Sequence, residues 1–225
     1  NYSAIWDYTL DLHIRVKKWI FLPRTKMLSL EERLAGKIDE RKNNNAFRQL
    51  HGQSVGIDFC SNDYLGLAKS PEIQQKILEL CISEYSLGST GSRLISGDSS
   101  QHQSVEHFLS DYHKGEAALI FNSGYDANVG FFSTIPQRGD IILYDELCHA
   151  SIRDGIRLSL AKGYSFSHND PSQLRLKLEQ FSGNIFVAIE SIYSMDGDNA
   201  PIEELVALCE EFGAHLIVDE AHSTG

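Results

Sequence analysis

The chain has 225 residues, an apolar fraction of 42% and a formal net charge of −11. This length and composition predict a globular protein with a packed core. The acidic balance argues against a nucleic-acid partner, because phosphate backbones are bound by basic patches. No apolar run approaches the length of a bilayer span, so we expect no membrane partner. Four widely spaced cysteines predict neither a zinc knuckle nor a disulfide framework, which favours a reducing cytoplasm.

Residues 1–28 differ from the rest of the chain, and we expect an N-terminal extension of unknown role. Apolar and polar residues alternate from Leu10 to Val16, which is the periodicity of a strand, and Pro23 closes the run.

Residues 29–70 are predicted to form an N-terminal helix followed by a substrate-side segment. Ser29 and Glu32 make a capping box that starts this helix. Residues 71–225 are predicted to form the large domain, which opens with a helix at Pro71.

Short apolar runs then alternate with helix-like stretches that begin near prolines. The predicted helices are Pro171–Gln180 and Glu203–Phe212, and the predicted strands are Ala117–Phe121, Asp140–Tyr144, Ile185–Ile189 and Leu216–Val218. This alternation predicts an α/β fold whose mostly parallel sheet is flanked by helices on both faces. Ligands of such sheets bind at the carboxyl ends of the strands.

Polar groups follow each of these predicted strands. Ser123 and Gly124 precede a helix whose free amides suit a phosphate, and His149 stands at the start of another helix. An acidic turn, Glu190–Asp198, follows the third strand, and Asp219 with His222 follows the fourth. Each feature alone has a plain structural explanation, such as a helix cap, a satisfied histidine or a local turn bond. Their succession at one sheet edge favours a ligand site.

Three other classes of site fit the sequence less well. Asp219–His222 spells the DEAH box of helicases, but the chain lacks the glycine-rich loop that ends in Gly-Lys-Ser or Gly-Lys-Thr. The spacing of the glycines in Gly88–Gly97 does not match a dinucleotide fingerprint, and no strand leads into them. The histidines of the segment His102–His113 are not spaced to share one helical face, so we expect no metal site.

Several motifs together resemble the α-oxoamine synthases, a family of fold type I enzymes that depend on pyridoxal 5'-phosphate (PLP). They are Ser61–Leu67, Gly88–Gly97, Ser123–Tyr125, His149–Ser151, Ser194–Asp198 and Asp219–Gly225. The resemblance runs from about residue 29 to the end and leaves residues 1–28 uncovered. It implies a PLP-binding large domain and an association of two identical subunits.

The resemblance also implies a role for individual residues. Asp219 would pair with the pyridinium nitrogen, His149 would stack on the ring, and His222 and Ser194 would lie near the phenolic oxygen. The backbone amides of Gly124 and Tyr125 would face the phosphate. The implied catalytic residues are His149, Asp219 and His222; the cofactor-binding residues are Ser123, Gly124, Tyr125, His149, Glu190, Ser194, Asp219 and His222; the substrate-binding residues are Arg48, Asn62 and His149.

The family condenses an amino acid with an acyl thioester and releases carbon dioxide, so electron density must be stabilised at the amino acid's α-carbon. A carboxylate at Asp219 would keep the ring nitrogen protonated, and each pKa unit of that preference corresponds to about 1.4 kcal/mol. Gly88–Gly97 and Asn169-Asp170 most resemble the members that use L-alanine and a pimeloyl thioester, carried on coenzyme A or acyl carrier protein. Members that accept other amino acids and acyl chains remain the alternative.

The family carries its cofactor on a lysine in the segment after the strand that ends at Asp219, whereas the given sequence ends at Gly225. We therefore expect the chain to hold the floor of the cofactor pocket without the covalent tether, and to be inactive alone. Lys114, Lys162 and Lys177 are expected in helices or loops as solvated charges. A noncatalytic partner for dimerisation is the second possibility.

Overall fold

The computed structural model describes residues 28–50, 56, 57, 59–83 and 88–224, which fall into two compact units, Asn1–Cys60 and Ser61–Gly225. The strand predicted at Leu10–Val16 lies outside the described residues. The domain boundaries predicted at residues 28 and 70 stay predictions. Among the described residues, no helix has the length and apolar character that crossing a bilayer requires.

Helix α1 (Leu30–Asn43) is the regular element among the described residues of the first unit. The Ser29 hydroxyl accepts a hydrogen bond from the Glu32 amide at 3.1 Å, and the Glu32 carboxylate accepts one from the Ser29 amide at 2.7 Å. These reciprocal bonds satisfy two amides that the first helical turn leaves without acceptors. The predicted capping box is confirmed.

A four-stranded sheet organises the second unit. Its strands pair in the order β2-β1-β3-β4, and every pair is parallel. The bounds are Ile141–Asp145 for β1, Lys162–Phe166 for β2, Ile185–Glu190 for β3 and His215–Asp219 for β4. The predicted parallel sheet is confirmed, and so are three of its predicted strands, with ends shifted by one residue.

Strand β2 was not predicted, and Lys162, which we expected in a helix or loop, is its first residue. Most of β2 is exposed, and only Phe166 at its end is buried. An edge strand with a single neighbour and little apolar content gives no periodic signal in the sequence.

The strand predicted at Ala117–Phe121 is wrong, because the described backbone is irregular there. The Ile120 amide donates to the Glu106 carboxylate at 2.9 Å, so a side chain takes the bond that a neighbouring strand would accept.

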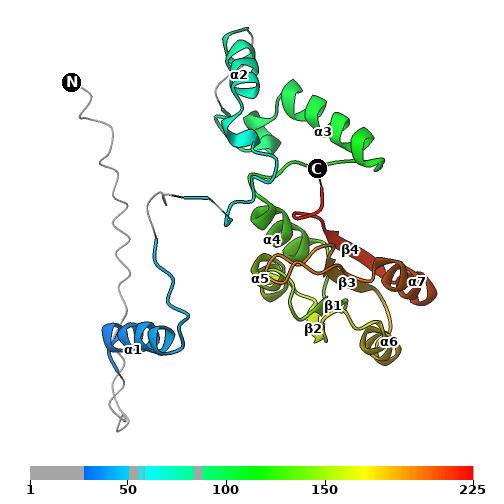
Figure 1. The fold of residues 1–225 in the computed structure, drawn as a ribbon. Coiled ribbons are helices and arrows are strands. Elements are labelled where there is room, and N and C mark those ends of the chain that lie inside the picture. Colours follow the sequence, from blue (N-terminus) through cyan, green and yellow to red (C-terminus); the bar gives the residue numbers. More distant parts are fainter. Residues whose placement is uncertain (1–27, 51–55, 58, 84–87, 225) are drawn as a thin grey trace. The chain divides into compact units, whose positions relative to one another are not determined.

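Helices cover both faces of the sheet, as predicted (Figure 1). Alternate residues of β3 point to opposite faces, so Val187 packs with helices α6 (Pro171–Gln180) and α7 (Ile202–Phe212). Ala188 packs on the other face with α4 (Gly124–Thr134) and α5 (Ala150–Leu158). All six residues of β3 are buried, and each large apolar side chain buried in this way contributes about 1.5–3 kcal/mol.

Four further elements precede the sheet: η1 (Leu67–Lys69), α2 (Pro71–Ser83), η2 (Arg93–Gly97) and α3 (Ser100–His113). The Ser70 hydroxyl caps α2 by accepting from the Ile73 amide. The Arg93 guanidinium binds both oxygens of Glu106, which fastens η2 to α3. The helix predicted to open at Pro71 is confirmed.

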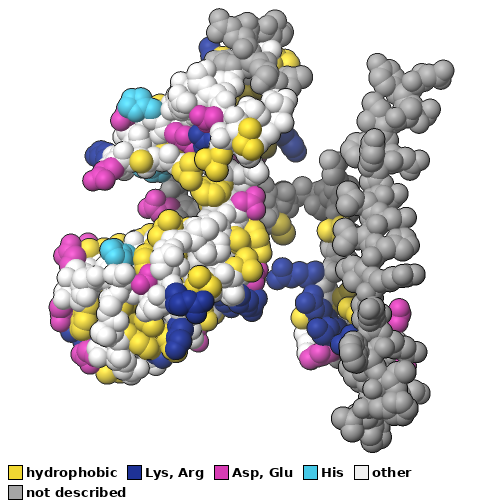
Figure 2. Space-filling view, turned by 180° about the vertical axis from the view of Figure 1, so that it is seen from behind, with side chains coloured by type: hydrophobic (Ala, Val, Ile, Leu, Met, Phe, Trp, Pro, Cys, Tyr) yellow, Lys and Arg dark blue, Asp and Glu magenta, His cyan; other side chains and the backbone are white. Residues whose placement is uncertain are grey.

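Large apolar side chains of these four elements are open to solvent. Leu94 in η2 is 99% exposed and Phe108 in α3 is 64% exposed, although residues of this kind are usually buried. Figure 2 shows hydrophobic side chains open on the surface seen there.

Gly155 allows α5 to lie closely against α4. A Cβ atom at this position would lie 2.9 Å from the Asn128 carbonyl oxygen and 2.9 Å from the Phe132 Cβ. We expect Gly155→Ala to lower the free energy of unfolding by about 1–3 kcal/mol, because overpacking forces backbone shifts. Urea denaturation checks this, with Gly36→Ala as the control, since nothing lies within 4 Å of a Cβ built at Gly36.

Candidate functional site

The parallel strands bring carboxylates to one edge of the sheet. Asp145, Glu190 and Asp219 are the last residues of β1, β3 and β4, and Glu190 pairs with Asp219 in the strand register. Asp145 is fully buried and Glu190 is 3% exposed. Like charges gathered at an edge with little water favour a cationic ligand group there.

The carboxylate of Asp219 is held in a fixed orientation. Its Oδ1 accepts a hydrogen bond from the Ala221 amide at 3.0 Å, and its Oδ2 accepts one from the Asn128 side chain at 2.8 Å. The residue is only partly buried. A carboxylate has about four acceptor positions, and these two donors leave capacity for a ligand.

His149 is linked to the Asp219 carboxylate by hydrogen bonds through Ser151 and Asn128. It caps helix α5, and its Nδ1 lies 2.7 Å from the Ser151 hydroxyl oxygen. The His149 amide donates to Glu190 Oε1, so Glu190 fastens the start of α5 to the end of β3.

Burial raises the pKa of Glu190, and the charge of Asp219 raises it further, while the backbone amides of His149 and Ser194 act in the opposite direction.

The predicted phosphate-binding residues lie at the start of helix α4, and their role stays a prediction. The Ser123 hydroxyl accepts from the Asp126 amide at 3.0 Å, and Gly124 and Tyr125 are the first two residues of the helix. Amides at these positions have no acceptor inside the helix. The Tyr125 hydroxyl donates to Asp154 at 2.7 Å, so it is directed toward α5.

Two other predicted residues lie on the loops at this edge. His222 Nδ1 lies 2.8 Å from the Tyr64 hydroxyl, which was not among the predicted site residues. Ser194 is exposed in the turn after β3. The structure thus brings His149, Glu190 and Asp219 together, with Ser194 and His222 on adjoining loops.

The two predicted substrate residues are placed differently. Asn62 is exposed and lies two residues before Tyr64 in the second unit. Arg48 belongs to the first unit, where it lines a shallow hollow with Phe47 and Arg41. Their roles stay predictions.

A partly buried network of three side chains near this edge was missed by sequence reasoning. His168 Nδ1 lies 2.9 Å from Asp145 Oδ1, and its Nε2 lies 2.8 Å from Asp198 Oδ2. Both ring nitrogens must carry protons to donate to both carboxylates. His168 therefore fastens the turn that contains Ser194 to the end of β1. Within the described residues, no group of three or more His, Cys, Asp and Glu side chains could hold a metal ion.

The stability of the protein should depend on pH through His168. Burial lowers the pKa of His168, but its hydrogen bonds to Asp145 and Asp198 outweigh burial, so the pKa lies above its ordinary value of 6.5. The protonated ring therefore stabilises the fold fully below pH 6.5, and this contribution is lost as the pH rises through the raised pKa. Urea unfolding of the wild type and His168→Gln, from about pH 6 to about pH 9, checks this. An equal pH dependence in both proteins would contradict it.

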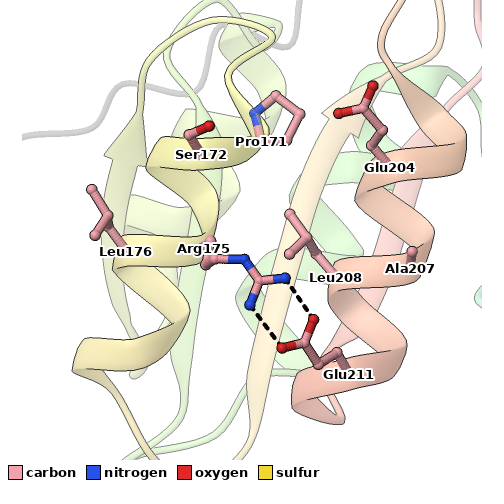
Figure 3. A pocket seen from close by; sticks show the side chains of 8 residues that line it. All are labelled: Pro171, Ser172, Arg175, Leu176, Glu204, Ala207, Leu208 and Glu211. Atoms are coloured by element: carbon pink, nitrogen blue, oxygen red, sulfur yellow. Dashed lines mark hydrogen bonds and ion pairs between the residues drawn. The ribbon is translucent and has the colours of Figure 1, made fainter.

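A surface hollow of the second unit lies apart from this site. It lies between α6 and α7, and the Arg175 guanidinium bridges it by binding both oxygens of Glu211 at 2.7 and 2.6 Å (Figure 3). None of its lining residues was predicted to bind a ligand. The hollow is an exposed groove between two surface helices.

A parallel sheet with polar groups at the carboxyl ends of its strands defines an α/β domain of the ligand-binding class. The chain belongs to the aminotransferase class I and II family, whose model matches residues 54–225. The match includes Asp219–His222, so these residues belong to this family and not to a helicase. The predicted family relationship and the fold type I architecture are confirmed.

Three relatives illustrate the match. The chain is 44% identical over 190 residues to an 8-amino-7-oxononanoate synthase of Emericella nidulans, covering 76% of this chain and 46% of the relative. A serine palmitoyltransferase from S. paucimobilis, solved with a bound PLP-myriocin aldimine, is 29% identical with a TM-score of 0.76, covering 86% of this chain and 53% of that one. A crystal structure of 8-amino-7-oxononanoate synthase from Francisella tularensis is 31% identical with a TM-score of 0.60, covering 73% and 44%. The chain thus spans about half the length of the relatives it matches.

Proposed function

We propose that the carboxyl edge of the sheet binds PLP and that the whole protein is a PLP-dependent acyltransferase. The main support for this proposal is the Asp219 carboxylate, which accepts hydrogen bonds from two donors at the end of β4. It shares the edge with the His149 imidazole and the start of α4.

The residues fit the three parts of the cofactor. The carboxylate of Asp219 suits a protonated ring nitrogen, because an opposite charge favours the cationic form. The imidazole of His149 is exposed and can lie on an aromatic ring. The amides of Gly124 and Tyr125 can donate to a phosphate, and the helix dipole attracts negative charge to the same end.

When bound, the protonated pyridine ring supplies an acceptor for the electron pair left at the substrate's α-carbon. The residues of the chain would bind and orient the ring for that chemistry. Asp219 would stabilise the positive ring nitrogen, and His149 would hold the ring from one face. His149 can also exchange a proton through Nε2, because Nδ1 is engaged by Ser151. His222 and Ser194 are proposed to lie near the phenolic oxygen.

The proposed reaction is the decarboxylative condensation of L-alanine with pimeloyl-CoA or pimeloyl-ACP, which gives 8-amino-7-oxononanoate in biotin synthesis. Relatives that carry the name of this synthase, with 44% identity in one case, support it. The similarity to serine palmitoyltransferase supports another α-oxoamine synthase as the second candidate. Arg48 and Asn62 are proposed to contact the substrate.

Titration with pyridoxamine 5'-phosphate tests the site directly. This compound has the ring and phosphate of PLP but no aldehyde, so it reports the pocket without a covalent bond. We expect saturable binding to the 225-residue chain, and at least about ten-fold weaker binding of pyridoxamine, which lacks the phosphate. Absence of saturable binding up to about millimolar ligand would overturn the proposal.

The chain alone is predicted not to carry PLP covalently. Lys162 is the first residue of β2 and so lies at the amino ends of the strands, away from the proposed site. Lys114 follows α3, and Lys177 lies in α6. We expect no yellow absorbance with PLP and no borohydride-reduced adduct at one specific lysine. Mass spectrometry after reduction checks this, and one stoichiometric lysine adduct would contradict it.

Association into a homodimer is proposed as well. The exposed apolar side chains of η2 and α3, including Leu94 and Phe108, support it, since a partner could cover them. Light scattering tests it, and a dimer that binds no pyridoxamine 5'-phosphate would favour the noncatalytic partner.

A cytoplasmic location is proposed too, supported by the free thiols of Cys148 and Cys209.

A further inference from the structure

Asn128 lies between the two side chains that the proposed function depends on most. Its Nδ2 is 2.8 Å from Asp219 Oδ2 and 3.0 Å from Ser151 Oγ. Ser151 Oγ lies in turn 2.7 Å from His149 Nδ1. A continuous chain of hydrogen bonds therefore runs from the carboxylate at the end of β4 to the imidazole at the start of α5.

The direction of each bond follows from the donors available. An ionised carboxylate only accepts, so the amide nitrogen of Asn128 must face Asp219. The second hydrogen of that nitrogen is donated to Ser151 Oγ, which leaves the hydroxyl hydrogen of Ser151 for His149 Nδ1. The Ser151 amide also donates to Nδ1, at 3.2 Å. Nδ1 therefore carries no proton, and the proton of the neutral ring lies on Nε2.

Packing holds these groups in place. Ser151 is fully buried, and Asn128 lies on α4 one turn after Gly124. Gly155 lets α5 approach so closely that the Asn128 carbonyl oxygen lies 2.9 Å from where its Cβ would be. The close contact of α4 and α5 brings Ser151 within reach of the Asn128 side chain.

We propose that Asn128 is a positioning residue that orients the Asp219 carboxylate and, through Ser151, fixes the tautomer of His149. This inference rests on the proposed function and deepens it. The Asn128 amide would orient both Asp219, the proposed partner of the PLP ring nitrogen, and His149, which is proposed to lie on the face of the PLP ring. Asn128 is not a catalytic residue, since it acts through Asp219 and Ser151.

Asn128→Asp tests the role of the amide, because aspartate has nearly the same shape but offers no N–H donor. The Ser151 hydroxyl would then donate to the introduced carboxylate in place of His149, and that carboxylate would face the one of Asp219. We expect pyridoxamine 5'-phosphate to bind at least about ten-fold more weakly. We also expect the 15N signals of the His149 ring to shift from the Nε2–H form toward a mixture of tautomers.

Ser151→Ala is the second variant, because it breaks the chain at its other bond without adding charge. The His149 signals should shift as in Asn128→Asp, while the Asp219 contact stays. Ser133→Ala is the matched control, because Ser133 lies on the same helix and its hydroxyl donates to the Gly130 carbonyl within that helix. Its affinity and its His149 spectrum should equal those of the wild type.

Binding of Asn128→Asp within two-fold of the wild type, or unchanged His149 signals in both variants, would overturn the inference. The NMR measurement needs no bound ligand, so it separates this inference from the proposed function. If the wild type binds no pyridoxamine 5'-phosphate while the His149 signals shift as expected, the proposed function fails and the positioning role stands.

Discussion

Asp219→Asn should weaken the binding of pyridoxamine 5'-phosphate by about 10- to 100-fold, the value of one hydrogen bond between charged groups. Asparagine keeps the shape of the side chain, but its single oxygen can accept from only one of the two donors, Asn128 and the Ala221 amide. The substitution also removes the negative charge that favours a protonated ring nitrogen. The loss of charge should appear as weaker binding of the ligand.

Two measurements check this prediction. The dissociation constant from an absorbance titration should rise, and the bound ring should lose its proton at a lower pH than in the wild type. Glu220→Gln is the matched control, because it removes one negative charge from the neighbouring, exposed residue. If the two variants bind equally well, general charge and not the placed carboxylate attracts the ligand, and the proposed role of Asp219 is wrong.

The sequence predicted the strands that contain an apolar run and missed the one that does not. Strand β3 is buried along its whole length, so its apolar run is continuous and easily recognised. Strand β2 contains Lys162 and Gly163 and owes its conformation to pairing with β1, which no local pattern reveals. Ala117–Phe121 has the composition of a strand, but the Glu106 carboxylate takes its backbone bond.

The candidate site divides in the same way. Asp219 and His149 could be predicted because each follows a strand, and the carboxyl ends of parallel strands meet at one edge. The contact of Asn128 with Asp219 joins residues 91 positions apart, and that of His168 with Asp198 joins residues 30 positions apart. Such pairs depend on how helices pack on the sheet, so a single sequence does not specify them.

Asp145→Ala should give the largest loss of stability, about 3–5 kcal/mol, as expected when one partner of a buried ionic pair is removed. The Asp145 carboxylate is fully buried and accepts from the Leu147 amide, the Asn169 amide and His168, each at 2.9 Å. Alanine would leave these three donors without their acceptor at a fully buried position. The loop after β1 and the loop after β2 would then lose their common anchor.

Urea denaturation measures the loss, and two variants show its origin. Asp145→Asn keeps one acceptor oxygen and should lose less than Asp145→Ala. Asp170→Ala removes only the cap of α6, whose side chain accepts from the Gln173 amide, and should cost about 1 kcal/mol. A loss from Asp145→Ala no larger than that from Asp170→Ala would show that the carboxylate does not anchor the edge. If the anchor holds, pyridoxamine 5'-phosphate should also bind more weakly to Asp145→Ala, because the turn that contains Ser194 depends on His168 and Asp198.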